Sequence, residues 1–170
     1  NIWVTNTNIS SSSVTKLRAR DGACIGACTF PVGNGPIGIA FDGANMWVAN
    51  SNSGTVTKLR ASDGANLGTF PVGSGAYGVA FDGANIWVTN NGGGSVSKLR
   101  ASDGATLGTF PVTNPVGIAF DGYNIWITNY IVNTVTKLRA SDGANLGSFP
   151  VGSSPYGVAF DGANIWVANT

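Results

Sequence analysis

Apolar and polar residues alternate over short segments of this chain, and each segment ends in a cluster of Gly, Ser, Asn or Asp. Such segments span Asn45–Asn50, Thr55–Arg60, Leu67–Val72 and Gly78–Phe81. Alternation with a period of two over four to eight residues is typical of β-strands with one buried face. The intervening Asn-Ser-Gly, Ser-Asp-Gly, Gly-Ser-Gly and Asp-Gly sequences favour tight turns. The pattern therefore predicts a meander of four antiparallel strands.

The meander recurs along the whole chain, as the spacing of its tryptophans shows. Trp3, Trp47, Trp87, Trp126 and Trp166 are 44, 40, 39 and 40 residues apart. The repeats span 1–44, 45–84, 85–123 and 124–163, and 164–170 begins a fifth. Repeats of this length with several short strands are typical of β-propeller blades. We expect an all-β chain in which residues 1–170 form one propeller domain or a segment of one.

The composition of each predicted strand suggests its place in the blade. Gly78 and Ala80 put small side chains on one face of Gly78–Phe81, which favours the innermost position; we expect that face to receive a tryptophan of the next blade. The Lys-Leu-Arg strand is expected further out, with its charged groups in a solvated belt. The tryptophans are interpreted as packing residues rather than as a ladder for stacking a ligand, because each occupies the same strand position.

The strands do not make whole repeats. The sequence contains four copies of the first, third and fourth strands but five of the second, at 2–6, 46–50, 86–90, 125–129 and 165–169. In a closed four-bladed ring, residues 1–6 and 164–169 would compete for one slot, and the surplus strand would expose an unpaired edge. The chain is therefore expected to be part of a longer array, or to complete a ring with another copy of itself.

The string Gly-Ile-Ala-Phe-Asp-Gly-Ala-Asn-Met-Trp-Val-Ala-Asn at 38–50, with its copies at 78–90, 117–129 and 157–169, resembles the blades of NHL, YVTN and streptogramin-lyase-like propellers. The resemblance covers the whole chain and implies propeller geometry, usually with six or seven blades. The lyase among these proteins relies on His and Glu residues with a divalent metal. This chain has no His and no Glu, so we expect no enzymatic activity and no cofactor.

Charge and composition limit the partners further. The net charge is +1 and the basic residues do not gather in one stripe, which excludes nucleic acid as an expected partner. No apolar run approaches the roughly 20 residues that span a bilayer. Low charge with abundant Ser, Thr, Asn and Gly favours a secreted or cell-envelope protein. The chain begins at Asn1 without a Met, consistent with processing or truncation, and Asn8-Ile9-Ser10 would accept a glycan in a eukaryotic secretory pathway.

Two groups of residues invite a chemical interpretation. Asp42, Asp82, Asp121 and Asp161 end the predicted inner strands, so their carboxylates would surround one mouth of a ring; they could hold a Ca²⁺-like ion, but capping of each Asp-Gly turn is favoured. Cys24 and Cys28 lie in an insertion of the first repeat. They are too far apart for a disulfide along a straight strand, at about 13 Å. A bridge therefore requires the insertion to loop out, and both states stay open.

The connections between strands differ in how much they vary. The Asp-Gly-Ala/Tyr-Asn and Ala-Ser/Arg-Asp-Gly-Ala turns are nearly constant. The second-to-third and fourth-to-first connections vary, and an up-and-down blade places both on one face. Loops of this kind carry recognition residues. The candidate binding residues at or beside this face are Tyr77, Tyr130, Ile131 and Tyr156. Unconstrained drift of the loops is the alternative.

We therefore interpret the chain as a non-catalytic binding or scaffold module outside the cytoplasm, with a protein or a carbohydrate as partner. One alternative is a fragment of a metal-dependent lyase or hydrolase whose catalytic residues lie outside this chain. The other is a self-assembling structural repeat protein.

Overall fold

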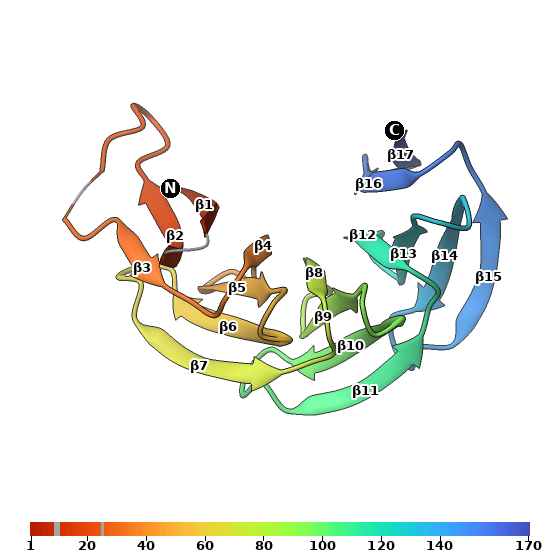
Figure 1. Ribbon diagram of the computed structural model, residues 1–170, viewed down its shortest axis with the longest axis horizontal. Helices are drawn as coiled ribbons and strands as arrows, with labels where there is room; N and C mark the ends of the chain where they lie inside the picture. Colours follow the sequence, from red (N-terminus) through yellow and green to blue (C-terminus); the bar gives the residue numbers. More distant parts are fainter. Residues whose placement is uncertain (9–10, 25) are drawn as a thin grey trace.

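The computed structural model describes residues 1–8, 11–24 and 26–170, which form an open arc of β-sheets with the two chain ends at its opposite tips (Figure 1). Ile9, Ser10 and Ile25 lie outside the described residues, and so does the predicted glycan acceptor Asn8-Ile9-Ser10. The described part consists of strands and turns. No helix in it is long and apolar enough to cross a membrane.

Three complete four-stranded sheets occupy the middle of the arc. Their strands are β4 (Pro36–Phe41), β5 (Asn45–Asn50), β6 (Thr55–Arg60) and β7 (Asn66–Pro71); β8 (Ala76–Phe81), β9 (Asn85–Asn90), β10 (Ser95–Arg100) and β11 (Thr106–Pro111); and β12 (Pro115–Phe120), β13 (Asn124–Asn129), β14 (Thr134–Arg139) and β15 (Asn145–Pro150). In each sheet, successive strands pair antiparallel in sequence order. These sheets are propeller blades, so the predicted all-β, four-stranded architecture is confirmed.

The sheets at the two tips are incomplete. The N-terminal sheet contains β1 (Ile2–Asn8), β2 (Ser11–Leu17) and β3 (Thr29–Pro31), and the C-terminal sheet contains β16 (Pro155–Phe160) and β17 (Ile165–Asn169). The described residues thus hold five strands of the second type, namely β1, β5, β9, β13 and β17, as the sequence predicts. The N-terminal sheet has no innermost strand, and the C-terminal sheet has only its two inner strands.

The inner strands β4, β8, β12 and β16 lie side by side along the concave side of the arc (Figure 1). Their glycines allow this approach. A Cβ atom on Gly38 would lie 2.1 Å from the Tyr77 carbonyl oxygen, and one on Gly117 would lie 2.2 Å from that of Tyr156. The prediction that these small positions receive a neighbouring tryptophan is wrong for the glycines: they admit the backbone of the next inner strand.

Trp47 and Trp87 pack instead against the second and third strands of the following blade. Trp47 and Trp87 are fully buried, and Trp87 shares a cluster with Ile125, Ile127 and Leu138 of the following blade. The structural interpretation is therefore confirmed for these two. At the C-terminal tip no further blade covers Trp166, which is 65% exposed.

Lys16, Lys58 and Lys98 of the third strands lie between blades and not in a solvated belt, so that prediction is wrong for them. Lys98 is only 7% exposed. Its ammonium group lies 5.0 Å from the ring centroid of Trp87 and donates to the carbonyl oxygens of Ala140 and Ser141 in the next blade, at 2.7 and 3.1 Å. Burial of an ammonium ion is tolerated because these groups replace its water. The arginines, such as Arg100, are half-exposed and pair with Asp103 of the adjacent turn.

The strand boundaries agree with the alternating pattern except at the inner and outer edges. β8 begins at Ala76, two residues before the predicted start, because Ala76 pairs with Asn90 while the amide of Gly78 leaves the ladder and donates to the Thr89 hydroxyl. β7 covers Asn66–Pro71 in place of the predicted Leu67–Val72, since a bulge shifts the register between Lys58 and Leu59.

A pair of glycine substitutions tests the close approach of the inner strands. Gly117→Ala should lower the free energy of unfolding by about 1 to 3 kcal/mol, because the new methyl group meets backbone that cannot move aside. Gly157→Ala is the matched control, since its Cβ would meet only the Ala168 Cβ at 3.7 Å; it should be neutral or stabilise by up to about 1 kcal/mol. Equal effects in urea unfolding would contradict this packing.

Candidate functional site

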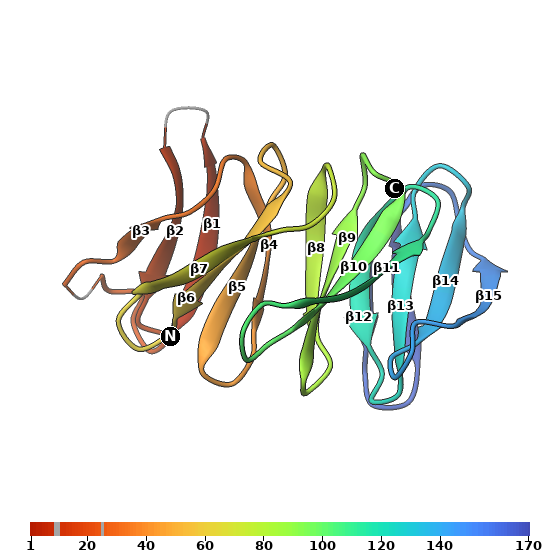
Figure 2. The same ribbon diagram turned by 90° about the horizontal axis from the view of Figure 1, so that it is seen from below.

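The strand connections emerge on two opposite edges of the arc (Figure 2). On one edge the amide of Ser51 donates to the Gly35 carbonyl at 2.8 Å, which joins a second-to-third loop to a fourth-to-first loop. On the other edge the amide of Ala101 donates to the Ala84 carbonyl at 3.1 Å, which joins the two constant turns. The predicted grouping of the connections is therefore correct. We call these edges the variable face and the uniform face.

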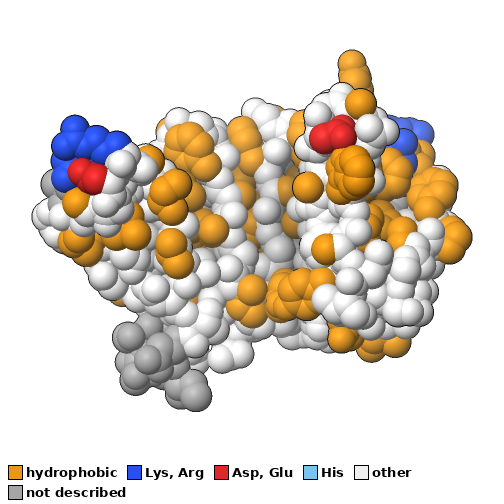
Figure 3. Space-filling model, turned by 90° about the horizontal axis from the view of Figure 1, so that it is seen from above, with side chains coloured by type: hydrophobic (Ala, Val, Ile, Leu, Met, Phe, Trp, Pro, Cys, Tyr) orange, Lys and Arg blue, Asp and Glu red, His pale blue; other side chains and the backbone are white. Residues whose placement is uncertain are grey.

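The variable face carries no charged side chain in its loops. Its loops contain no Lys, Arg, Asp or Glu; they are Thr7–Ser13, Gly33–Pro36, Ser51–Gly54, Gly73–Ala76, Asn91–Gly94, Thr113–Pro115, Tyr130–Asn133 and Gly152–Pro155. In the view onto the concave side, the charged side chains gather toward the upper edge and none is visible along the lower edge (Figure 3). A partner of this face would have to be recognised by shape, apolar contact and neutral hydrogen bonds.

Three of the predicted binding residues form an aromatic cluster at the variable face. The Tyr156 ring lies edge-on to both Tyr77 and Tyr130, with ring centroids 5.8 and 6.2 Å apart. Such T-shaped contacts are the favoured arrangement of aromatic pairs. The cluster brings together β8, β16 and the loop after β13. Tyr156 and Tyr130 are still 43% and 40% exposed, so their rings remain open to a partner.

Ile131, the fourth predicted residue, is not among the aromatic contacts. It is 67% exposed at the tip of the loop between β13 and β14, beside Val132, which is 46% exposed. The tip extends the apolar surface outward from Tyr130. The tyrosine cluster with Ile131 and Val132 therefore forms one apolar rim on this part of the variable face.

A polar pocket adjoins that rim. It has a volume of about 290 Å³ and is lined largely by hydroxyl and amide side chains, namely those of Thr113, Asn129, Thr134, Thr136, Asn145 and Ser148, with Pro111, Val112 and Val132. Asn129 is 2% exposed; its amide donates to Thr134 and Thr136, whereas its carbonyl oxygen has no partner. In the preceding blade the corresponding oxygen, on Asn90, accepts from the Gly73 amide. The carbonyl oxygen of Asn50 is buried without a donor in the same way, so this feature of Asn129 belongs to the blade and does not by itself mark a ligand.

Left-handed backbone at the variable face is a requirement of its turns. Among the described residues, those other than glycine with a positive φ are Asn114, Asn133 and Ser154. Equivalent positions in the preceding blades hold glycines with the same sign of φ, such as Gly75 at 69° and Gly94 at 57°. The chain therefore keeps the turn geometry while replacing glycine by polar side chains near the tyrosine cluster. In this conformation the Asn133 side chain accepts a hydrogen bond from the Ser154 amide.

The aspartates on the uniform face have structural roles. The Asp82 carboxylate accepts hydrogen bonds from the amides of Ala84 and Asn85, and from the Trp87 indole at 2.7 Å. Asp42, Asp121 and Asp161 repeat this arrangement in their own turns. Burial by itself raises the pKa of Asp82, but the indole and amide donors outweigh it and hold that pKa below its usual value.

These bonds support the capping interpretation over the metal interpretation. Both carboxylate oxygens of Asp42, Asp82 and Asp121 are engaged by donors of the same turn. Within residues 1–8, 11–24 and 26–170, no three side chains of the types that bind metals come together. The indole bond was not foreseen from the sequence, although the constant spacing of five residues between Asp and Trp is a signal for it.

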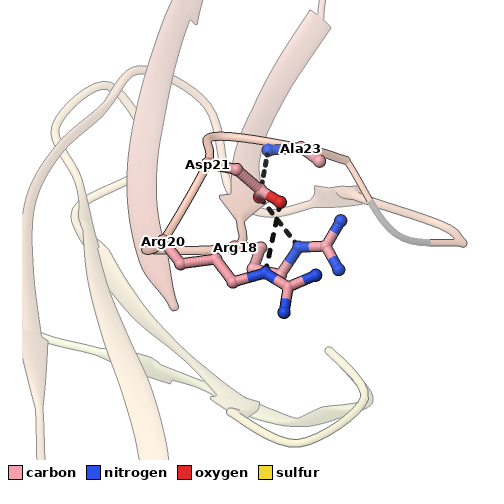
Figure 4. A network of polar contacts seen from close by, with 4 residues as sticks. All are labelled: Arg18, Arg20, Asp21 and Ala23. Atoms are coloured by element: carbon pink, nitrogen blue, oxygen red, sulfur yellow. Dashed lines mark hydrogen bonds and ion pairs between the residues drawn. The ribbon is translucent and has the colours of Figure 1, made fainter.

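The insertion of the first repeat loops out, and Cys24 and Cys28 form a disulfide with their Cα atoms 5.6 Å apart. The turn that precedes it is held by Asp21, which accepts from Arg18, Arg20 and the Ala23 amide (Figure 4). This turn contains the one arginine pair that converges on a single carboxylate among the described residues. It belongs to the uniform face and lies outside the candidate binding site.

Comparison with known proteins supports the fold. No family model and no curated protein matches the sequence. Among solved structures, the chain is similar to streptogramin B lyase (21% identity, TM-score 0.75, 91% of this chain and 54% of that one). It is also similar to virginiamycin B lyase from Staphylococcus aureus (19%, 0.76, 94% and 57%) and to hydrazine synthase from Kuenenia stuttgartiensis (19%, 0.73, 87% and 45%).

The chain is thus a β-propeller array of the kind seen in the streptogramin-lyase-like proteins, as the resemblance of its repeats implies. At these identities the likeness shows the fold alone. The chain spans about half the length of the solved structures that it matches.

The lowered pKa of Asp82 has a consequence for stability in acid. A carboxylate whose pKa is lower in the folded state stabilises the protein above its unfolded pKa, and this stabilisation is lost as the pH falls through the folded value. Asp82→Asn should cost about 1 to 2 kcal/mol at pH 7 and make the loss of stability below about pH 4 shallower. Unfolding by urea between pH 2 and 7 measures both. Asp103→Asn, at an exposed turn, is the control and should cost less; a larger cost there would contradict the role of the indole bond.

Proposed function

We propose that this chain is a non-catalytic binding module that recognises a neutral carbohydrate on its variable face, at the tyrosine cluster and the adjoining polar pocket. The observation that carries the proposal is the combination of an open aromatic rim with a pocket of hydroxyl and amide groups. A sugar ring presents an apolar face that packs on aromatic rings and equatorial hydroxyls that need hydrogen-bond partners.

The hydrogen-bonding groups suit such a ligand. The side chains of Thr134, Asn145 and Ser148 line the pocket and are open to solvent, and each can donate or accept a hydrogen bond. A pocket of about 290 Å³ lies near the lower end of ligand-pocket sizes and can accept a small ring such as one sugar unit. The remaining rings of an oligosaccharide would then extend across Tyr130 and Tyr156.

The absence of charge in the variable loops narrows the ligand class. Anionic sugars and phosphorylated ligands are generally bound through Arg, Lys or a metal ion, and these loops supply no basic side chain. A neutral glycan needs neither. A secreted or cell-envelope location fits both this ligand class and the Cys24–Cys28 disulfide, since disulfides persist in oxidising compartments.

Binding of a panel of neutral oligosaccharides, measured by isothermal titration calorimetry, tests the proposal. Tyr156→Ser should weaken binding of the best glycan at least tenfold, about 1.4 kcal/mol, because Tyr156 contacts both other tyrosines. The free energy of unfolding should change by less than about 0.5 kcal/mol, as for a half-exposed side chain.

Tyr123→Ser is the matched control, because Tyr123 is 83% exposed on the uniform face. It should leave binding unchanged. A glycan whose affinity falls equally in both variants, or no binding by any glycan in the panel, would refute the proposal. Addition of a chelator addresses the lyase alternative: binding or glycan turnover that disappears with the chelator would favour a metal-dependent enzyme.

A further inference from the structure

The three complete interfaces between neighbouring sheets use one repeated pair of contacts. The first is the lysine ammonium group of a third strand, which donates to two carbonyl oxygens in the next sheet's uniform-face turn. Lys16 donates to Ala61 and Ser62 at 2.9 and 2.6 Å, and Lys58 and Lys98 do the same one and two sheets further on. The donor and its acceptors are always one sheet apart.

The second contact is a phenylalanine of the fourth strand that lies against a glycine in the same turn of the next sheet. A Cβ atom on Gly64 would lie 2.1 Å from the Phe30 ring, and one on Gly143 would lie 2.0 Å from that of Phe110. Gly104 and the Phe70 ring repeat the arrangement at 2.2 Å. Each sheet thus presents an ammonium group and a ring on one side, and two carbonyls and a glycine on the other.

The C-terminal end of the arc presents the side with the ammonium group and the phenylalanine ring, but no carbonyl oxygens or glycine of a following sheet meet them. Lys137 lies 4.9 Å from the Trp126 ring centroid, but among the described residues its ammonium group donates to no carbonyl oxygen. Phe149 packs against Trp126 with the two ring planes tilted, and it is 44% exposed, whereas Phe30 at the equivalent position is 8% exposed. A further turn is missing from this end.

The N-terminal end presents the other side of the interface, with the two carbonyl oxygens and the glycine. Ala19, Arg20 and Gly22 correspond in the repeat to Ala61, Ser62 and Gly64. No described donor reaches the carbonyl oxygens of Ala19 and Arg20, and no atom lies within 4 Å of a Cβ placed on Gly22. The Asp21 network of Figure 4 holds this turn in shape, with both arginine side chains directed to the carboxylate.

The inner edge of the N-terminal sheet is also open. β1 has no inner strand beside it, and a cavity of about 370 Å³ lies there, lined by Asn1, Ile2, Trp3, Phe41, Met46 and Ala61. The indole N–H of Trp3 lacks the aspartate that every other tryptophan has among the described residues. The strand that would supply such an aspartate is of the β16 type, which ends at Phe160 and is followed by Asp161.

We propose that the C-terminal end of one molecule docks on the N-terminal end of a second copy, with β16 pairing with β1 of that copy in place of β17. The two strands are interchangeable, because residues 2–6 and 165–169 share the sequence Ile-Trp-Val-x-Asn. β16 would occupy the cavity beside Trp3 of the second copy, and Asp161 would accept its indole hydrogen bond. Lys137 and Phe149 would meet the turn of Ala19, Arg20 and Gly22 of the second copy.

Replacement of β17 by β1 of the second copy beside β16 is favourable because β17 is the less stably packed of the two strands. β17 is a five-residue strand paired on one side only, and its Trp166 is 65% exposed, whereas β1 pairs with β2 over seven residues. A head-to-tail interface of this kind produces a closed ring when the rotation that relates one copy to the next divides a full turn evenly. Each copy would supply three complete sheets and the two copies would share two more, so a closed dimer would have eight blades, within the range of known propellers.

Sedimentation velocity of the 170-residue chain across micromolar concentrations tests this inference. A dimer is expected, and Lys137→Met should raise its dissociation constant at least tenfold, because the variant keeps the packing over Trp126 but loses the donor. Arg139→Met, on the same strand but paired with Asp142 at the surface, is the matched control and should leave the constant unchanged.

A second variant moves the equilibrium in the opposite direction. Trp166→Ser weakens β17 in its competition for β16, so it should tighten the dimer and leave the rest of the arc intact. A chain that stays monomeric at all concentrations would overturn the inference and assign both open ends to other partners, such as further repeats. A dimer that responds to none of these variants would overturn it as well. Glycan binding by the monomeric variants is measured separately, so the two proposals can fail independently.

Discussion

The arc depends on the placement of one lysine ammonium group in each of its three complete interfaces. The Lys98 side chain begins in one sheet, crosses the face of Trp87 and ends on two carbonyl oxygens of the next sheet. An ammonium ion without water is destabilising unless its three hydrogens find acceptors or an electron-rich face. The buried lysine is therefore stable only when the turn of the neighbouring sheet places its two carbonyl oxygens within hydrogen-bonding distance of the ammonium group. The same condition fixes the indole, whose N–H is held by Asp82. The apolar packing of the indole and the hydrogen bonds of the lysine and aspartate therefore stabilise the same arrangement of neighbouring sheets.

Much of this fold could be predicted from the alternation of residue types. In the second repeat the predicted second and third strands agree with the structure, because Asn45–Asn50 and Thr55–Arg60 have a clear period of two and clear turns on both sides. The prediction for the first repeat, 2–6, is two residues shorter than β1. The inner strand could not be delimited, since the departure of the Gly78 amide from the ladder depends on the Thr89 hydroxyl beside it. The lysine could not be placed either. Its alternation puts it on the same side as the exposed arginine, and only the next sheet, more than 40 residues away, distinguishes them.

The candidate site was partly visible in the sequence for similar reasons. The variation of the loops indicated the face, and the tyrosines were the large side chains near it. That Tyr77 and Tyr130 both meet Tyr156 follows from the curvature of the arc, which no local pattern specifies. The polar pocket depends on the neighbourhood of Asn129, where the connection before β12 is shorter than the one before β8. The lack of Lys, Arg, Asp and Glu in these loops, in contrast, can be seen directly in the sequence.

The nearly constant contact between neighbouring sheets makes the molecule close to a one-dimensional array, in which a blade packs mainly on the blades beside it. The contact between Tyr77 and Tyr156, which spans the intervening blade, is an exception. The cost of a substitution then depends on position along the array as much as on residue type. Trp87 has a neighbour on both sides, while Trp166 has one on one side only. A gene encoding such an array can gain or lose a unit of about 40 residues by unequal recombination, and the new neighbours will already fit. The architecture is therefore open to change in length without the invention of a single new contact, and its binding face can diversify one loop at a time.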